Sequence, residues 1–419
     1  MAGLAVEGAT LDGAEVGLRV GEDGLIAEIG PGVGAAPGDE RIDGSGTALV
    51  PGLVNGHTHA AMTLFRGYAD DLPLMDWLQD HIWPAEAKLD AEDVYWGTRL
   101  ACAEMIRTGT VRFWDMYWEP EATARAVADA GLRATLGAPL IDRMDPAGLP
   151  KLREDAAAGL EAVASVGSDL VTASLAPHAI YTVSTASLEW IGAEAERLRV
   201  PIQIHASETE GEVEDCVQAH GVRPIELLDR LGVLGESTLL AHAVWLDDGE
   251  RELIRAAGAT AVTNPVANMK LAVGAAFDLS AAQRFGIPVG LGTDGAGSNN
   301  SLDLLADAKH LALLQKHVAA DASVAPADEV LAIMTGARAP LLGASALAAG
   351  SAADFILVRT ETPELGIGSL AAGLVYAASG AVVDTTVVAG RVLMRGGVVE
   401  GVDEILAKAR ERAARIGLR

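Results

Sequence analysis

Short β-prone runs alternate along most of the chain with longer segments rich in Ala, Leu and Glu. The runs end in polar or glycine-rich turns, and segments such as Ala91–Arg107 and 187–199 are amphipathic at helical spacing. This alternation predicts βα units and a parallel sheet. The expected strands cover residues 48–59, 110–117, 132–140, 170–178, 200–208, 237–245, 259–265 and 286–294.

The number of these units bears on the choice between two α/β folds. Eight strands within residues 52–347 match the strand count and usual length of a (β/α)8 TIM barrel. A doubly wound open sheet is the alternative. We favour the barrel, because nearly every expected strand ends in polar residues and a closed barrel gathers such ends at one face.

Both ends of the chain have a different pattern, in which short alternating runs are separated by glycine-rich turns. These runs are Ala14–Val20, 25–29, 354–358 and 382–394. They predict antiparallel strands. We therefore expect residues 1–50 and 348–419 to form one small composite β-sandwich domain beside a catalytic barrel over 51–347. The last stretch, Val402–Arg415, is predicted to be a helix.

Composition narrows the classes of binding partner and the cellular compartment that we expect for the protein. The 419 residues carry 31 basic and 58 acidic side chains, a formal net charge of −27. Such a surface repels phosphates, so we expect neither a nucleic acid nor an anionic membrane as partner. Apolar runs stay shorter than the roughly 18 residues that a membrane span needs. The two cysteines, Cys102 and Cys216, do not form a secreted disulfide framework, which predicts a cytoplasmic protein.

Residues with metal-ligand chemistry end four of the expected strands. His57 and His59 stand two apart at the end of the first, so both imidazoles can point to one face. His205 and His242 end the fifth and sixth strands, and Asp294 ends the eighth. Each alone is explained as well by a satisfied core histidine or a helix cap. Together they predict a divalent ion held by three imidazoles and one carboxylate, with a position left open for water.

A single ion is expected, because the bridging lysine of two-metal barrels has no counterpart here. The chain has six lysines, and the fourth strand ends instead in Ala176-Pro177-His178. Glu208 lies three residues beyond His205. A carboxylate at that place could take a proton from a metal-activated water. A surface glutamate that opens the next helix is the equally simple alternative.

Several motifs resemble those of known enzymes. The strand-end histidines and aspartate, with Glu208, resemble the metal-dependent amidohydrolase superfamily. Further motifs resemble the 5′-methylthioadenosine/S-adenosylhomocysteine deaminases, and this resemblance covers nearly the whole chain. These motifs are Met62-Thr63-Leu64-Phe65-Arg66-Gly67, Ala69-Asp70-Asp71-Leu72-Pro73-Leu74, Asp115-Met116-Tyr117, Asn268-Met269-Lys270-Leu271 and Ser298-Asn299-Asn300.

The resemblance implies a hydrolytic deaminase of adenosines modified at the 5′ position. It assigns the metal ligands to His57, His59, His205 and Asp294. Zn²⁺ is the expected ion, with Fe²⁺ and Mn²⁺ as alternatives. Glu208 matches the family's proton shuttle. His242 matches the histidine that hydrogen-bonds the attacking water or the purine, and Asp294 also orients that water.

The resemblance also implies a nucleoside-binding set. Glu86 matches the carboxylate that holds the ribose hydroxyls, Trp77 lies at its packing partner, and His178 matches a residue that touches the nucleoside. Without the family, Trp77 would be a packing residue and Glu86 a solvated helix residue. A small-molecule nucleoside is thus the expected partner, and a homo-oligomer, dimer or tetramer, is the expected assembly.

One departure bears on the substrate. Family members that accept S-adenosylhomocysteine hold its carboxylate with arginines after the third strand, whereas the first such place here matches Ala138. Arg143, Lys151 and Arg153 are only loosely placed. We therefore expect 5′-methylthioadenosine or 5′-deoxyadenosine to be preferred. The alternatives are an aminohydrolase of another heterocycle (guanine, an oxidised purine, a triazine or aminodeoxyfutalosine) and a barrel that has lost catalysis and serves in binding or assembly.

Overall fold

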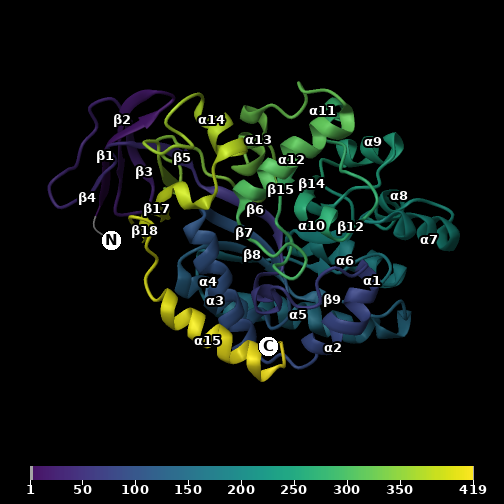
Figure 1. Ribbon diagram of the computed structural model, residues 1–419. Helices are drawn as coiled ribbons and strands as arrows, with labels where there is room; N and C mark the ends of the chain where they lie inside the picture. The colour runs from purple at the N-terminus through teal and green to yellow at the C-terminus, as the bar shows by residue number, and fades with distance from the viewer. Residues whose placement is uncertain (1–2, 419) are drawn as a thin grey trace.

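The computed structural model describes residues 3–418, and Figure 1 shows a terminal β layer beside a larger α/β body. Parallel strands in the middle of the chain form the body, so the predicted α/β class is confirmed. Its strands are β6 (Leu53–Thr58), β7 (Thr110–Met116), β8 (Arg133–Gly137), β9 (Pro139–Leu140), β10 (Val171–Ala173), β11 (Ala176–Pro177), β12 (Ile202–Ala206), β13 (Thr238–His242), β14 (Thr260–Thr263) and β15 (Val289–Leu291).

These strands pair in three groups, with the orders β10-β8-β7-β6, β11-β9 and β12-β13-β14-β15. The edges of the groups touch. Leu175 bridges to Ile202 in parallel fashion. On the opposite edge the Asp294 N–H donates to the His57 carbonyl oxygen at 3.0 Å. The carboxyl ends of β6, β12, β13 and β15 therefore lie near one another.

Three of the expected strands are divided. Residues 48–59 form β5 (Thr47–Pro51) and β6, because the chain changes partner between them: Gly52 N–H donates to Asp354 and Leu53 N–H to Gly109. The runs 132–140 and 170–178 divide into β8 with β9 and β10 with β11. Pro139 and Pro177 have no N–H to donate to a ladder, which shortens the second part of each run.

The two ends of the chain share one eight-stranded sheet with the order β18-β17-β16-β5-β1-β2-β3, in which β4 also pairs with β1. Antiparallel pairing of β16 with β5 joins the ends. The pairs β1–β4 and β1–β5 are parallel, whereas the four runs predicted to be antiparallel, in β2, β3, β16 and β17–β18, do pair in that way. The remaining bounds are β1 (Leu4–Leu11), β2 (Ala14–Val20), β3 (Ile26–Gly30), β4 (Glu40–Asp43), β16 (Phe355–Arg359), β17 (Val383–Val388) and β18 (Arg391–Met394).

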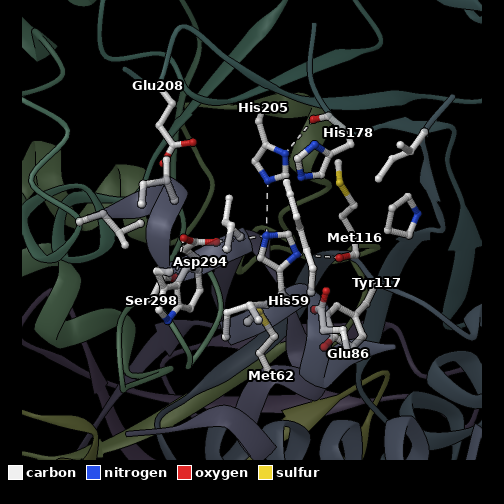
Figure 2. A pocket seen from close by; sticks show the side chains of 18 of the residues that line it. His59, Met62, Glu86, Met116, Tyr117, His178, His205, Glu208, Asp294 and Ser298 are labelled. Carbon is white, nitrogen blue, oxygen red and sulfur yellow. Dashed lines mark hydrogen bonds and ion pairs between the residues drawn. The ribbon is translucent and has the colours of Figure 1, made fainter. Parts of the chain in front are cut away.

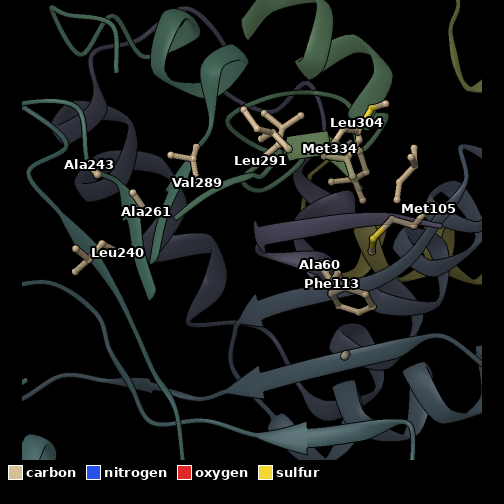
Figure 3. Packing of buried hydrophobic residues seen from close by; sticks show 14 of the residues in the cluster. Ala60, Met105, Phe113, Leu240, Ala243, Ala261, Val289, Leu291, Leu304 and Met334 are labelled. Atoms are coloured by element: carbon tan, nitrogen blue, oxygen red, sulfur yellow. The ribbon is translucent and has the colours of Figure 1, made fainter. Parts of the chain in front are cut away.

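Helices cover the parallel strands, and the core lies between the two layers. Met105 of α3 and Phe113 of β7 are fully buried where helix meets strand, as Leu240 and Leu291 are farther along (Figure 3). The helices are α1 (Leu74–Asp76), α2 (Trp83–Glu86), α3 (Ala91–Arg107), α4 (Pro120–Ala130), α5 (Leu149–Ser165), α6 (Thr185–Leu198), α7 (Glu210–His220), α8 (Pro224–Arg230), α9 (Asp248–Ala257), α10 (Pro265–Lys270), α11 (Leu279–Phe285), α12 (Leu304–Ala319), α13 (Ala327–Met334), α14 (Leu370–Ala372) and α15 (Val402–Arg415).

Two further helical stretches shape the site. A 3₁₀ helix, η1 (Ala60–Phe65), follows the first histidine pair, and a π-helix, η2 (Trp77–Ile82), joins α1 to α2. Shorter turns of helix lie at Pro146–Gly148, Pro340–Leu342, Gly373–Ala377 and Gly380–Val382. The predicted last helix, α15, lies along α3 (Figure 1).

Both cysteines are buried and free. Among residues 3–418, no helix has both the length and the apolar character needed to cross a membrane.

Candidate active site

His57 is the buried member of a histidine–aspartate cluster at the carboxyl ends of the strands, beside a pocket that His59, His205 and Asp294 line. Its side chain is fully buried, and neither ring nitrogen has a hydrogen-bond partner within residues 3–418. Its Nε2 lies 3.6 Å from Oδ1 of Asp294. Because a buried polar atom without a partner is costly, these two nitrogens indicate that a further group belongs beside them.

Two backbone carbonyls orient the neighbouring imidazoles. Nδ1 of His59 lies 2.6 Å from the Met116 oxygen, and Nδ1 of His205 lies 2.7 Å from the His178 oxygen. Each Nδ1 must donate, which leaves both Nε2 atoms as lone-pair donors. Figure 2 shows these Nε2 atoms turned toward one another, 3.4 Å apart.

Asp294 completes this cluster from the other side. Its Oδ1 lies 3.3 Å from His59 Nε2, while its Oδ2 accepts a hydrogen bond from Ser298 at 2.6 Å. The residue has a left-handed backbone, with φ at 61°. The Asp294 carbonyl accepts the Thr58 hydroxyl at 2.9 Å. Strands β6 and β15 thus hold the aspartate against the first histidine pair.

The donor set fits a divalent metal ion. Ligand atoms of His57, His59 and His205 lie within 4.8 Å of one another, as do those of His57, His242 and Asp294. Burial lowers the pKa of His57 to about 4 and that of His205 well below its usual value, so both imidazoles are neutral and can offer a lone pair to an ion. Burial also acts to lower the pKa of His59, but Asp294 outweighs it and raises the pKa to about 9. A bound ion would have to displace that proton.

Glu208 lies beside the cluster, next to His242 of the second donor group. Oε1 of Glu208 is 3.7 Å from Nδ1 of His242, which lies 2.7 Å from the Asn268 side-chain oxygen. Glu208 is only 5% exposed, and burial raises its pKa. The alternative of a surface glutamate is therefore wrong. Such a carboxyl group is suited to proton transfer near neutral pH.

The other wall of the pocket comes from the segment 74–86. Trp77 on η2 is buried and Glu86 at the end of α2 is half-buried, and both line the pocket. The Trp118 indole N–H donates to Glu86 at 3.4 Å. His178 lines the pocket too, and burial lowers its pKa to about 3, so its ring is neutral. All the predicted site residues except His57 line this one cavity, and His57 lies in the donor cluster beside it.

Residues 48–393 of the chain match the amidohydrolase family. The chain belongs to this family.

Known relatives of this amidohydrolase are deaminases. The 5′-deoxyadenosine deaminase of Methanoregula boonei is 47% identical over 382 residues, 90% of this chain and 86% of the relative. A 5-methylthioadenosine/S-adenosylhomocysteine deaminase of Archaeoglobus fulgidus is 43% identical over 96% of this chain and 95% of its own. The solved structure of a Xanthomonas campestris adenosine deaminase with bound zinc superposes with a TM-score of 0.89 at 34% identity, covering 99% and 98% of the two chains. The predicted family and the predicted class, a hydrolase of the deaminase type, are confirmed.

Sequence reasoning missed several residues that support the site of this amidohydrolase. Asn268 lies in a motif that we had noted for its resemblance alone, yet it fixes His242. Glu212 is buried and accepts the N–H groups of Ser207 at 2.9 Å and Glu208 at 2.8 Å. A Glu four residues after Glu208 on a predicted helix was the available signal. Met116 contributes a carbonyl, for which a sequence has no signal.

The side-chain direction of Ala138 bears on the expected absence of a carboxylate clamp. Its side chain faces α5, beside Gly159 and Ala156, whereas Pro139 and Ile141 face the pocket, as the alternation of an extended chain requires. An arginine at 138 would point away from the substrate. Two of the three loosely placed basic residues are engaged elsewhere, with Lys151 on Asp155 and Arg153 over the Trp190 ring.

The lining of the pocket is acidic and apolar. Among the described residues that line it there is no lysine or arginine. Aromatic and aliphatic side chains surround the carboxylates of Glu86, Glu208 and Asp294. The apolar part comprises Met62, Leu74, Trp77, Leu78, Ile82, Trp83, Met116, Trp118, Pro139, Ile141 and Leu271.

Proposed function

We propose that this amidohydrolase is a metal-dependent deaminase that replaces the 6-amino group of 5′-modified adenosines with oxygen and releases ammonia. One observation carries this proposal: a single pocket joins a His/Asp donor cluster to a second carboxylate, Glu86. The cluster suits hydrolysis, and a carboxylate at the other wall suits the two hydroxyls of a ribose. The named activities of the relatives support the same substrate class.

His57, His59, His205 and Asp294 would hold the ion, and we propose Zn²⁺. Imidazole nitrogens and carboxylate oxygens are ligands that zinc prefers. The related structure with 34% identity contains bound zinc. When bound, the ion supplies Lewis acidity that lowers the pKa of water from near 16 to about 7.

Glu208 then carries the proton. Its carboxylate takes a proton from the attacking water and delivers it to ring N1, which makes C6 electrophilic. Hydroxide adds to C6, Glu208 carries the remaining proton of the new hydroxyl to the amino group, and the C6–N6 bond breaks with loss of ammonia, which leaves a C6 carbonyl and the proton on N1. The raised pKa of Glu208 helps it to hold the proton between these transfers. His242, fixed by Asn268, and Asp294 orient the attacking water toward C6.

The 5′ group should be small and apolar. Because no lysine or arginine is among the described residues that line the pocket, the carboxylate of S-adenosylhomocysteine would find no cationic partner there. 5′-Deoxyadenosine and 5′-methylthioadenosine are therefore expected to have kcat/KM values at least equal to that for S-adenosylhomocysteine.

An ammonia-release assay over these three nucleosides, adenosine and guanine tests both the activity and its substrate range. Guanine as the preferred substrate, or no ammonia from any adenosine, would contradict the proposal. A clear preference for S-adenosylhomocysteine would contradict the 5′ assignment alone.

Glu86 is proposed to accept both ribose hydroxyls. A hydrogen bond to a charged acceptor is worth roughly 1.5–3 kcal/mol, so Glu86→Ala should lower kcat/KM for a ribonucleoside on the order of 10²-fold. For the 2′,3′-dideoxy analogue the loss should be much smaller, because that substrate lacks the hydroxyls. Wild type and Glu86→Ala, each measured on both sugars, form a double-mutant cycle. Equal losses on both sugars would make Glu86 a structural residue.

The architecture around the site completes the proposal. We propose that residues 51–347 form one closed (β/α)8 barrel, supported by the Leu175–Ile202 bridge and the Asp294–His57 bond at the two edges. Residues 1–50 and 348–419 would form the small β-sandwich domain. The pairing of Leu25 with Ala352 supports a sheet that curls onto itself. The cytoplasmic location and the dimeric or tetrameric assembly stay predictions. Size-exclusion chromatography with light scattering measures the assembly.

A further inference from the structure

Lys270 joins three segments through residues that have no role in the proposed chemistry. It is the last residue of α10, and its Nζ donates to Asp70 at 2.6 Å and Asn300 at 2.8 Å. A third bond, at 3.2 Å, goes to the Gly297 carbonyl. Asn300 closes the ring, because its amide donates to the second oxygen of Asp70 at 2.9 Å. The lysine thus uses all three of its donors.

These bonds hold backbone that is otherwise unfavourable. Ala69 and Asp71, on either side of Asp70, have φ values of 54° and 66°, and Asn300 has 67°. Such left-handed conformations are unfavourable for residues with a Cβ, most of all for Ala69, while Asp and Asn tolerate them better. The Lys270 side chain is 21% exposed and that of Asp70 29%, so the ion pair is partly shielded from solvent. A loop of this kind needs its contacts to keep one shape.

Asp70 and Gly297, two hydrogen-bond partners of Lys270, are each connected along the chain to residues that line the pocket. Asp70 comes four residues before α1, which opens the segment 74–86 with Trp77 and Glu86. Gly297 precedes Ser298, whose hydroxyl holds Asp294 at 2.6 Å. Gly297 also lies against Trp77, since a Cβ there would be 3.1 Å from the ring. Within α10 itself, Asn268 holds His242.

From this geometry we propose that Lys270 is a positioning residue that sets the separation between the metal-ligand end of the pocket and the segment carrying Glu86. The inference rests on the proposed function, because it takes Glu86 as the ribose-binding group. Lys270 does not line the pocket. It acts through the Asp70 loop and Gly297, so its loss should disturb the fit of the nucleoside more than the chemical step.

Lys270→Met keeps the length of the side chain and removes its donors. KM for a ribonucleoside should rise on the order of 10-fold or more, with a much smaller change in kcat, because misplacement by about 1 Å is costly. KM for the 2′,3′-dideoxy analogue should change little. Asp70→Asn should shift KM in the same direction, and the double variant should be no worse than Lys270→Met alone.

Lys316→Met is the matched control. Lys316 also donates to three oxygens, the carbonyls of Ala322, Val324 and Ala325. Unlike the partners of Lys270, these residues do not adjoin the segments that line the pocket. Its replacement should lower Tm and leave KM unchanged. Hydrogen exchange of amides 74–86 gives a readout that needs no activity, and it should speed up in Lys270→Met but not in Lys316→Met.

The possible results distinguish a failure of the proposed role of Lys270 from a failure of the proposed function on which that role rests. An active wild type with unchanged KM in both Lys270→Met and Asp70→Asn, or with equal KM increases on both sugars, overturns the role of Lys270. If Lys270→Met fails to fold, Asp70→Asn decides by the same criterion. A wild type that releases no ammonia overturns the proposed function, and hydrogen exchange then still decides whether Lys270 holds the segment.

Discussion

Glu208→Gln is expected to lower kcat by at least about 10²-fold, the usual scale for the loss of a general acid–base group. Glutamine keeps the size and much of the hydrogen bonding of the side chain, but it cannot carry a proton. Glu208 is buried 3.7 Å from His242 and lies outside the shortest contacts of the donor cluster. Metal content, measured by plasma emission spectrometry, should therefore stay near the wild-type value.

Glu210→Gln is the control for this experiment. Glu210 opens α7 two residues later and is exposed, so the same chemical change there should leave kcat unaltered. A Glu208→Gln protein that loses its metal would show that Glu208 is a ligand. Wild-type kcat in that variant would remove it from the mechanism.

Removal of the metal is expected to abolish turnover, and Zn²⁺ should restore it. The pH dependence of binding follows from His59, whose pKa of about 9 lies above its ordinary value of 6.5. Below pH 9 the metal-free protein carries a proton there that a ligand cannot keep, so the apparent affinity should fall about tenfold per pH unit between pH 9 and 6. His57, with a pKa of about 4, adds no competition in that range.

Calorimetric titration of the metal-free protein with Zn²⁺ in buffers of different ionisation enthalpy measures both the affinity and the number of protons released. Release of about one proton per ion at pH 7.5 is the expected result. An affinity that does not vary over this pH range would show that His59 is not a ligand. Full activity in protein shown to be metal-free would contradict the mechanism as a whole.

The histidines could be located from the sequence because their signal is local. His57 and His59 have the two-residue spacing of a strand, and each of His205 and His242 ends an apolar run. Parallel strands bring such ends together whatever the loops do. Glu86 and Trp77 lack that advantage, since they lie on a segment of α- and π-helix far from any strand end. Only the family resemblance located them.

What the sequence could not predict depends on backbone atoms and long-range contacts. The carbonyls of Met116 and His178 orient two imidazoles. Every residue has a backbone carbonyl, so residue type does not reveal which carbonyls have this role. In the ring of Asp70, Lys270 and Asn300, Asp70 lies 200 positions from Lys270 and 230 from Asn300. Ala138 shows a subtler limit, because the family resemblance suggested the position, whereas the direction of its side chain toward α5 could be seen only in the structure.

The terminal sheet has a consequence for how the chain folds during synthesis. Strand β5 lies between β1 and β16, and Ala48 pairs with Val358. The first strands therefore leave the ribosome long before their neighbour exists, and β5 keeps an open edge throughout elongation. Open edges are templates for pairing with other chains. Contacts between such distant residues also slow folding. A growing chain thus exposes an aggregation-prone edge until β16 is made, which gives chaperones a defined interval in which to act.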